Sequence, residues 1–292
     1  MPSKFYTSDK PALSFELFPP RTPAGNRAMF SHLDKLMAFR PAFVTCTYGA
    51  GGSTRDRTLE IVCEVKKQYE IPVASHLTVV DASKDQLRQY LARARDNQID
   101  FIVALRGDPP SGHAVFQPAA DGLHYANELV ELIRAEFPEF GIAVAGYPET
   151  HQEAPNADVD LENLKRKVDA GGDIVITQLF YDNADFFDFR DRAENAGINV
   201  PIIPGLLPVL SLKQVRKITQ LCGARLPADF ATRLSEKPDD ADWQQQVGIE
   251  QATRQVEELV KRGVAGLHFY VLNKSASTIA ILSSLENLSL NI

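Results

Sequence analysis

Cysteine is scarce in this chain. Its 292 residues include three cysteines, Cys46, Cys63 and Cys222, and no two of them form a Cys-x-x-Cys pair. Disulfide scaffolds and cysteine-based zinc sites need more cysteines, at paired spacings. The sequence therefore excludes both, and it favours three buried thiols in a reducing compartment.

Long apolar runs and an excess of positive charge are also missing. The most apolar segment, residues 198–210, is interrupted by Pro201, Pro204 and Pro208, and it is shorter than the ~18 residues of a membrane helix. The first residues lack the apolar core of a signal peptide. A net charge of −7, from 31 basic and 38 acidic residues, argues against nucleic-acid binding. We therefore expect a cytoplasmic protein with small-molecule ligands and no nucleic-acid or membrane partner.

Short apolar segments of strand type alternate with longer amphipathic segments. The strand candidates are residues 12–18, 42–47, 73–79, 101–105, 142–146, 174–180, 201–206 and 267–272. Helical spacing of apolar residues covers 26–39, 57–69, 84–97, 163–170 and 275–285, and two additional helices fit at 228–235 and 243–262. This order predicts an α/β fold, a (β/α)8 TIM barrel in one domain over residues 1–292, with extra helices between strands seven and eight. A doubly wound open sheet is the alternative, but no Gly-x-Gly-x-x-Gly follows the first strand.

The first strand candidate places a carboxylate where a barrel carries its active site. Alternation puts Ser14, Glu16 and Phe18 on one face, and the apolar residues between them on the other. Glu16 should therefore point into the barrel mouth at the carboxyl ends of the strands. Removal from water there would raise its pKa toward that of a general acid. A structural glutamate paired with Arg21 is the alternative.

Other strand ends also carry polar side chains. They include Thr47, His76, Arg106, Asp108, Tyr147, His151 and Gln178. A strand histidine such as His76 is more often a hydrogen-bonded core residue than a ligand-binding one, whereas the amide of Gln178 needs a partner. On the following helix Asp160, Asn163 and Lys167 share one face. No His-Glu-x-x-His or similar spacing indicates a metal site. The residues thus predict a barrel enzyme for an anionic, planar ligand and leave the reaction open.

Seven tracts in sequence order carry a resemblance to a known family. They are Phe15-Glu16-Leu17-Phe18-Pro19-Pro20-Arg21-Thr22, Thr47-Tyr48-Gly49, Leu105-Arg106-Gly107-Asp108, Tyr147-Pro148-Glu149-x-His151, Asn163-Leu164-Lys165-Arg166-Lys167-x-Asp169-Ala170-Gly171, Ile176-Thr177-Gln178 and His268-Phe269-Tyr270-x-Leu272-Asn273. Each tract alone is weak evidence. Together they span nearly the whole chain and resemble methylenetetrahydrofolate reductase of the short bacterial type.

The resemblance implies a reaction. FAD would accept hydride from NADH or NADPH, and 5,10-methylenetetrahydrofolate would then bind in place of the nicotinamide and be reduced to 5-methyltetrahydrofolate. The two half-reactions together would be a ping-pong mechanism. The reaction would belong to one-carbon metabolism and supply methionine synthesis. By the same resemblance, Glu16 is the general acid that opens the five-membered ring of the substrate to a 5-iminium cation. Asp108 is the carboxylate beside the flavin and the pterin, and the chain forms a homo-oligomer.

The resemblance also implies binding residues. Gln178 matches the amide shared by the folate and nicotinamide positions, Thr47 matches a hydroxyl of the nicotinamide site, and Gln214 and Lys274 match folate contacts. With Thr47 and Asp108, the implied cofactor-binding set is Tyr48, Ala50, His76, Arg106, Gly107, Tyr125, Ala126, Tyr147, His151, Asp160, Asn163, Arg166 and Lys167.

Two departures from the family pattern matter. Lys274 stands where bacterial members tend to carry arginine, and lysine lacks the bidentate fork of arginine. The chain also ends soon after the last predicted helix, so we expect no C-terminal regulatory domain that binds S-adenosylmethionine. The alternatives are another FAD-dependent barrel oxidoreductase, similar to proline dehydrogenase, and a non-redox barrel that binds folate.

Overall fold

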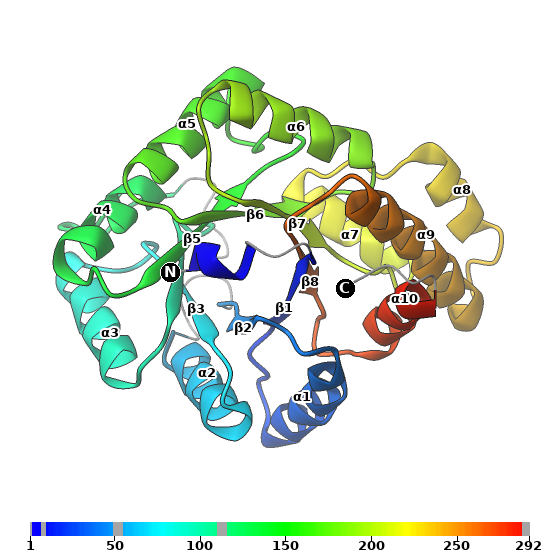
Figure 1. The fold of residues 1–292 in the computed structure, drawn as a ribbon, viewed down its shortest axis with the longest axis horizontal. Coiled ribbons are helices and arrows are strands. Elements are labelled where there is room, and N and C mark those ends of the chain that lie inside the picture. Colours follow the sequence, from blue (N-terminus) through cyan, green and yellow to red (C-terminus); the bar gives the residue numbers. More distant parts are fainter. Residues whose placement is uncertain (1, 7–9, 49–54, 110–115, 288–292) are drawn as a thin grey trace.

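The computed structural model describes residues 2–6, 10–48, 55–109 and 116–287. Eight parallel strands pair in chain order, and β1 pairs with β8, so the sheet closes into a barrel (Figure 1). The strands are β1 Ala12–Leu17, β2 Phe43–Cys46, β3 Val73–Thr78, β4 Phe101–Leu105, β5 Gly141–Gly146, β6 Ile174–Leu179, β7 Ile202–Leu206 and β8 Gly266–Tyr270. The predicted (β/α)8 TIM barrel is therefore confirmed.

Helices form a ring around the barrel (Figure 1). They are α1 Pro23–Leu36, α2 Arg55–Tyr69, α3 Lys84–Asp96, α4 Ala126–Glu136, α5 Ala157–Asp169, α6 Asn183–Asn195, α7 Leu212–Cys222, α8 Ala228–Ser235, α9 Ala241–Lys261 and α10 Ala276–Asn287. As predicted, α8 and α9 are the two extra helices before β8. In the described part of the chain, no helix has the length and apolar character to cross a membrane.

Capping residues decide where the helices begin. Ser83 caps α3 and forms a reciprocal capping box with Gln86. Asn156 caps α5 by accepting a hydrogen bond from the Val159 amide at 3.0 Å. This helix therefore starts at Ala157 rather than at residue 163. The apolar pattern missed its first turns because Leu164 is the one side chain of α5 that is buried.

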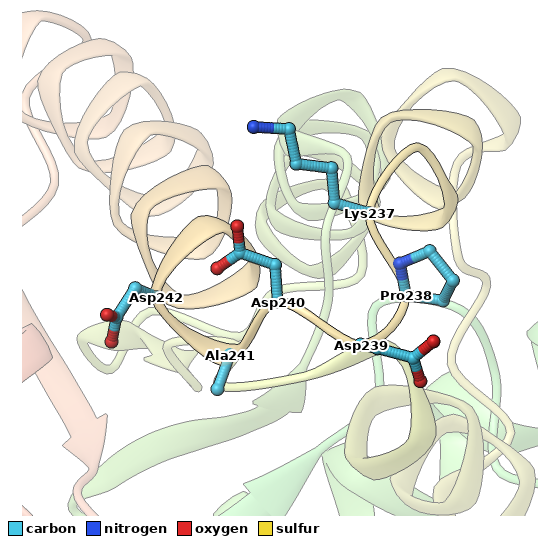
Figure 2. Close-up of a pocket in the computed structure, with 6 residues that line it drawn as sticks. All are labelled: Lys237, Pro238, Asp239, Asp240, Ala241 and Asp242. Atoms are coloured by element: carbon cyan, nitrogen blue, oxygen red, sulfur yellow. The ribbon is translucent and has the colours of Figure 1, made fainter.

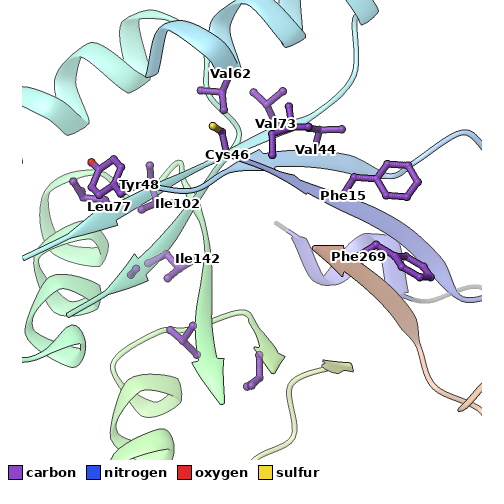
Figure 3. Close-up of a cluster of buried hydrophobic side chains, with 14 of the residues drawn as sticks. Phe15, Val44, Cys46, Tyr48, Val62, Val73, Leu77, Ile102, Ile142 and Phe269 are labelled. Carbon is purple, nitrogen blue, oxygen red and sulfur yellow. The ribbon is translucent and has the colours of Figure 1, made fainter. Parts of the chain in front are cut away.

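The main hydrophobic core lies between the strands and the helices (Figure 3). Phe15 on β1 and Phe269 on β8 are fully buried, and their ring centroids lie 6.3 Å apart. On the neighbouring strand β2, Cys46 lies below Val62 of α2 (Figure 3). The predicted alternation is confirmed on β1, because Phe15 belongs to this outer layer while Glu16 lines a cavity inside.

A short 3-10 helix, η1 (Pro2–Tyr6), covers the amino-terminal end of the barrel. The ring centroid of Phe5 lies 6.2 Å from that of Phe43 and 5.6 Å from that of Phe101, which are the first residues of β2 and β4. Aromatic contacts of this kind add to the apolar area that is buried. The amino-terminal end is thus packed with aromatic rings, and the polar strand ends are left at the opposite, carboxyl end.

Candidate active site

A cavity of about 480 Å³ opens at the carboxyl ends of the strands, a size that suits a small molecule. Its wall is formed by residues of six of the eight strands, by residues of the loops that follow strands, those after β2 and β7 included, and by Ile218 of α7. Ten of the residues singled out from the sequence line it: Glu16, Thr47, Tyr48, His76, Arg106, Gly107, Asp108, Tyr147, His151 and Gln178. The expectation that polar strand ends meet in one place is therefore confirmed for these residues.

Glu16 lies between two histidines from other strands. Its Oε2 is 3.2 Å from Nε2 of His76, on β3, and 3.4 Å from Nε2 of His268, on β8. Nδ1 of His268 is in turn 2.8 Å from Oγ of Ser14. A carboxylate held by two imidazoles at the wall of a cavity can store and transfer a proton. We call Glu16, His76 and His268 the proton cluster.

The prediction of a raised pKa for Glu16 is wrong. Burial does raise it, but the charges and hydrogen bonds of His76 and His268 together outweigh burial, and the pKa falls from 4.5 to about 2. Arg21, the alternative partner considered from the sequence, is exposed, and the two histidines pair with Glu16 instead. Glu16 is therefore a carboxylate at neutral pH and acts as an acid only after a proton reaches it.

The chain turns sharply after β4, at the tract Arg106-Gly107-Asp108. Gly107 has a φ of +88°, and an added Cβ would lie 2.8 Å from Cγ1 of Val80. Only glycine meets both conditions without strain. The turn places Arg106 and Asp108 on the cavity wall, with Asp108 exposed at its mouth.

Arg106 is paired with a carboxylate from the loop after β5. Its Nη1 and Nη2 donate to the two carboxylate oxygens of Glu153 at 2.5 and 2.8 Å. The Arg106 guanidinium also lies 5.3 Å from the ring centroid of Phe116. Hydrogen bonding within this pair raises the pKa of Arg106 and lowers that of Glu153, so both groups stay charged. An anionic ligand would have to displace Glu153 to use this fork.

Tyr147 and His151, which follow β5, are supported from behind by α5. Their rings pack edge to face, with centroids 4.6 Å apart. The His151 amide donates to Asp160 at 3.0 Å. Nζ of Lys167 lies 2.5 Å from the Ala145 carbonyl oxygen and 5.9 Å from the Tyr147 ring centroid. Burial lowers the pKa of Lys167 to about 8, although Asp160 opposes this shift. Asp160 and Lys167 therefore brace the wall and are not among the residues that line the cavity.

Several candidates lie further out. On α5, Nη1 of Arg166 donates to the side-chain oxygen of Asn163 at 3.2 Å, and both residues are exposed. Tyr125, which precedes α4, is 61% exposed, and Ala126 is the first residue of that helix. Ala50 lies outside the described residues.

The two proposed folate contacts are not among the residues that line the main cavity. The Gln214 side chain accepts a hydrogen bond from the Leu210 amide at 3.3 Å, next to the start of α7. Lys274 lines a small hollow that shares Leu207 and Tyr270 with the main cavity. The two spaces are therefore neighbours.

Three residues that the sequence interpretation did not assign belong to this site. They are His268, Tyr270 and Glu153. Strand alternation could have identified the first two, because His268 and Tyr270 stand two positions apart on β8, as Ser14 and Glu16 do on β1. Nothing in the local pattern marks Glu153, which lies in an irregular loop.

A second hollow lies over the connection between α8 and α9 (Figure 2). It is lined by Lys237, Pro238, Asp239, Asp240, Ala241 and Asp242. Asp240 caps α9 by accepting from the Trp243 amide at 2.9 Å, and Nζ of Lys237 lies 4.5 Å from the Trp243 ring centroid. These contacts are those expected at the start of a helix, so the structure of α9 explains the shape of this loop. Within the described residues, no group of three His, Cys, Asp or Glu side chains is arranged to hold a metal ion.

The fold and the cavity define a barrel of the enzyme type, with its site at the carboxyl ends of the strands. A family model described as methylenetetrahydrofolate reductase matches residues 3–286. The 5,10-methylenetetrahydrofolate reductase of Escherichia coli K12 is 43% identical over 273 residues, which cover 94% of this chain and 90% of that protein. The chain therefore belongs to the methylenetetrahydrofolate reductase family.

More distant relatives agree with this placement. Methylenetetrahydrofolate reductase (NADH) 1 of Arabidopsis thaliana is 38% identical over 94% of this chain, which spans 48% of the plant protein. A solved structure of an uncharacterized Clostridium thermocellum protein that binds two copies of 5-methyl-5,6,7,8-tetrahydrofolic acid aligns with a TM-score of 0.66 and 18% identity. That alignment covers 98% of this chain and 97% of the other, and at such identity it supports the fold alone.

Proposed function

We propose that this protein uses FAD to reduce 5,10-methylenetetrahydrofolate to 5-methyltetrahydrofolate, with NADH or NADPH as the hydride source, in a ping-pong reaction. Membership of the reductase family supports the substrate and the product. The observation that carries the proposal is the proton cluster, which places an ionisable carboxylate between two imidazoles at the wall of the cavity. Opening the ring of the substrate requires such a proton donor.

The polar atoms of the cavity wall fit a planar cofactor that forms hydrogen bonds. Within the described residues, Nδ1 of His76 and Oγ1 of Thr78 are buried without a hydrogen-bond partner, and such atoms normally bind a ligand or water. Tyr48, Tyr147 and Arg106 line the same space. We expect these residues to hold FAD, which when bound would supply the group that carries hydride between the two substrates.

In this proposal the proton cluster donates the proton that opens the imidazolidine ring. Glu16 gives that proton to the substrate nitrogen, and the carboxylate is then protonated again through the histidine on either side. The lowered pKa of Glu16 depends on its contacts with those two histidines, which outweigh the effect of burial.

Charge and hydrogen bonding would orient the two substrates. Asp108 places a carboxylate at the mouth, where negative charge stabilises the iminium cation formed on ring opening. Gln178 and Thr47 line the cavity and present hydrogen-bonding groups to a pterin or a nicotinamide. Lys274 would supply a positive charge for the glutamate tail of the folate from the neighbouring hollow, and Gln214 would lie along the same path.

An anaerobic flavin titration tests the proposal. We expect the purified protein to bind FAD, to lose its yellow colour with NADH or NADPH, and to regain it when methylenetetrahydrofolate is added. Adding each nicotinamide in turn decides which one serves. A protein that binds folate but cannot be reconstituted with FAD would be a non-redox folate-binding barrel. Bleaching by proline and not by nicotinamide would indicate an enzyme similar to proline dehydrogenase, and either result rejects the proposal.

A further inference from the structure

The pairing between β6 and β7 is irregular directly beside the cavity. Ile176 pairs with Ile203 and Leu179 pairs with Gly205, so two residues of β6 stand opposite one residue of β7. This is a β-bulge, a device that changes the direction of a side chain next to a site. The opposing residue is Pro204, which has no N–H to donate to the neighbouring strand.

At the bulge, two backbone groups form hydrogen bonds with side chains instead of with the backbone of the neighbouring strand. The hydroxyl of Tyr270, on β8, donates to the Thr177 carbonyl at 2.7 Å. The Gly205 amide donates to the Thr177 hydroxyl at 2.9 Å. Tyr270 thus reaches across β7 to β6, and it supplies a donor to the Thr177 carbonyl, since the Gly205 amide goes to the Thr177 hydroxyl instead.

Gly205 provides the space for this cross-strand contact. A Cβ at Gly205 would lie 2.1 Å from the Thr177 carbonyl oxygen and 2.8 Å from the Tyr270 hydroxyl oxygen. Any larger residue would therefore push the phenol away from Thr177. The hydrogen bond and the glycine depend on each other.

The residue that follows Thr177 in the bulge is Gln178, which lines the cavity. Its Oε1 accepts a hydrogen bond from the Leu179 amide at 2.9 Å, which fixes the side-chain amide relative to the strand. We propose that Tyr270 is a positioning residue, which anchors the Thr177 carbonyl across Gly205 and thereby aims the Gln178 amide at bound folate and nicotinamide. The inference rests on the proposed function, in which Gln178 contacts both substrates.

A double-mutant cycle on the FAD-loaded enzyme tests the positioning role. Tyr270→Phe removes only the hydroxyl, and it is made in the native chain and in the Gln178→Ala background. We expect the KM for methylenetetrahydrofolate to rise about 5–20-fold in the native chain and less than twofold in the Gln178→Ala background, because the two residues act as one unit. The same increase in both backgrounds, or none in the native chain, would overturn the proposal.

Tyr181→Phe is the matched control. Tyr181 lies two residues after β6, and its buried hydroxyl has no hydrogen-bond partner in the described part of the chain. It is not among the residues that line the cavity. We expect this variant to leave the KM and the dissociation constant for FAD unchanged within twofold. A KM increase equal to that of Tyr270→Phe would show a general effect of losing a buried hydroxyl and would also overturn the proposal.

Amide hydrogen exchange measures the stability of the hydrogen bonds at the bulge and does not require enzyme turnover. Tyr270→Phe should speed exchange of the Gly205 amide about tenfold, because its acceptor Thr177 loses its anchor, while Tyr181→Phe should not. An unchanged exchange rate of the Gly205 amide in Tyr270→Phe would reject the role of Tyr270 as an anchor, irrespective of the enzyme's activity. Faster exchange in Tyr270→Phe, together with no folate turnover by the native protein, would instead reject the proposed function and leave the anchor in place.

Discussion

Glu149 offers a test of how burial tunes a carboxyl group beside the site. Both of its carboxylate oxygens accept the Arg225 amide, at 2.9 and 3.1 Å. The Arg225 guanidinium binds Asp185 at 2.7 Å and Asp182 at 3.3 Å. Burial is the main reason that the pKa of Glu149 rises from 4.5 to about 7; the Arg225 amide opposes this and the charge of Asp185 adds to it. The loop after β5 is thereby tied to α6 and to the segment after α7.

The sign of the effect follows from proton linkage. Because the folded protein holds the Glu149 proton more tightly than the unfolded chain, this group stabilises the fold below pH 4.5 and loses that contribution as the pH rises through about 7. A pKa difference of this size corresponds to at most about 3 kcal/mol. The Glu149 side chain is 15% exposed and that of Arg225 is 57% exposed, so screening by water reduces the expected loss to about 1–2 kcal/mol.

Glu149→Gln removes the titrating group and keeps the shape. Urea unfolding of both proteins at pH 5, 6, 7 and 8 should show the native chain losing about 1–2 kcal/mol more than the variant over this range. Glu139→Gln, at an exposed glutamate on the opposite end of the barrel, controls for the loss of one negative charge. A stability difference between Glu149→Gln and the native chain that stays constant from pH 5 to pH 8 would refute the reasoning.

Two further variants test the site. Glu16→Gln should slow folate reduction by about 10²–10⁴-fold in single turnover, because it removes the proton donor. The rate of nicotinamide-driven flavin reduction should stay within a few-fold of that of the native chain. An equal loss in both steps would show that Glu16 is structural. Glu153→Gln should tighten FAD binding about 3–10-fold, because Arg106 is released from its ion pair with Glu153. Titration of the apoprotein with FAD measures this change. Weaker binding would show that Glu153 instead holds Arg106 in the conformation that binds the cofactor.

The sequence predicts the fold well because all eight strands and most of the helices carry their own apolar period, although α4, α6 and α7 are not among the predicted ranges. It also predicts that Glu16 faces the cavity, since strand alternation is a local property. The pKa of Glu16 could not be predicted in the same way. Its controlling partners, His76 and His268, come from β3 and β8, and a pattern along one strand carries no information about groups that meet through space.

The same distinction separates the strand-end residues from those on α5. Arg106 and Gln178 lie at the ends of strands, and the barrel brings them to the cavity. Lys167 shares a helix face with Asp160, as expected, but it faces the Ala145 carbonyl behind the wall. Helical spacing shows which side chains are neighbours, and only the packing of α5 on β5 decides where they point.

The seam between β1 and β8 has a consequence for how the protein matures. This seam joins Ala12 to Gly266 and brings Ser14 and Glu16 to His268. Because residues 12–16 pair with residues 266–270, their pairing must wait until β8 has been synthesised, and contacts so distant in sequence form slowly. The proton cluster is therefore assembled only when the ring of strands closes. Catalytic competence and barrel closure should appear together during refolding, which makes turnover a reporter of the last folding event.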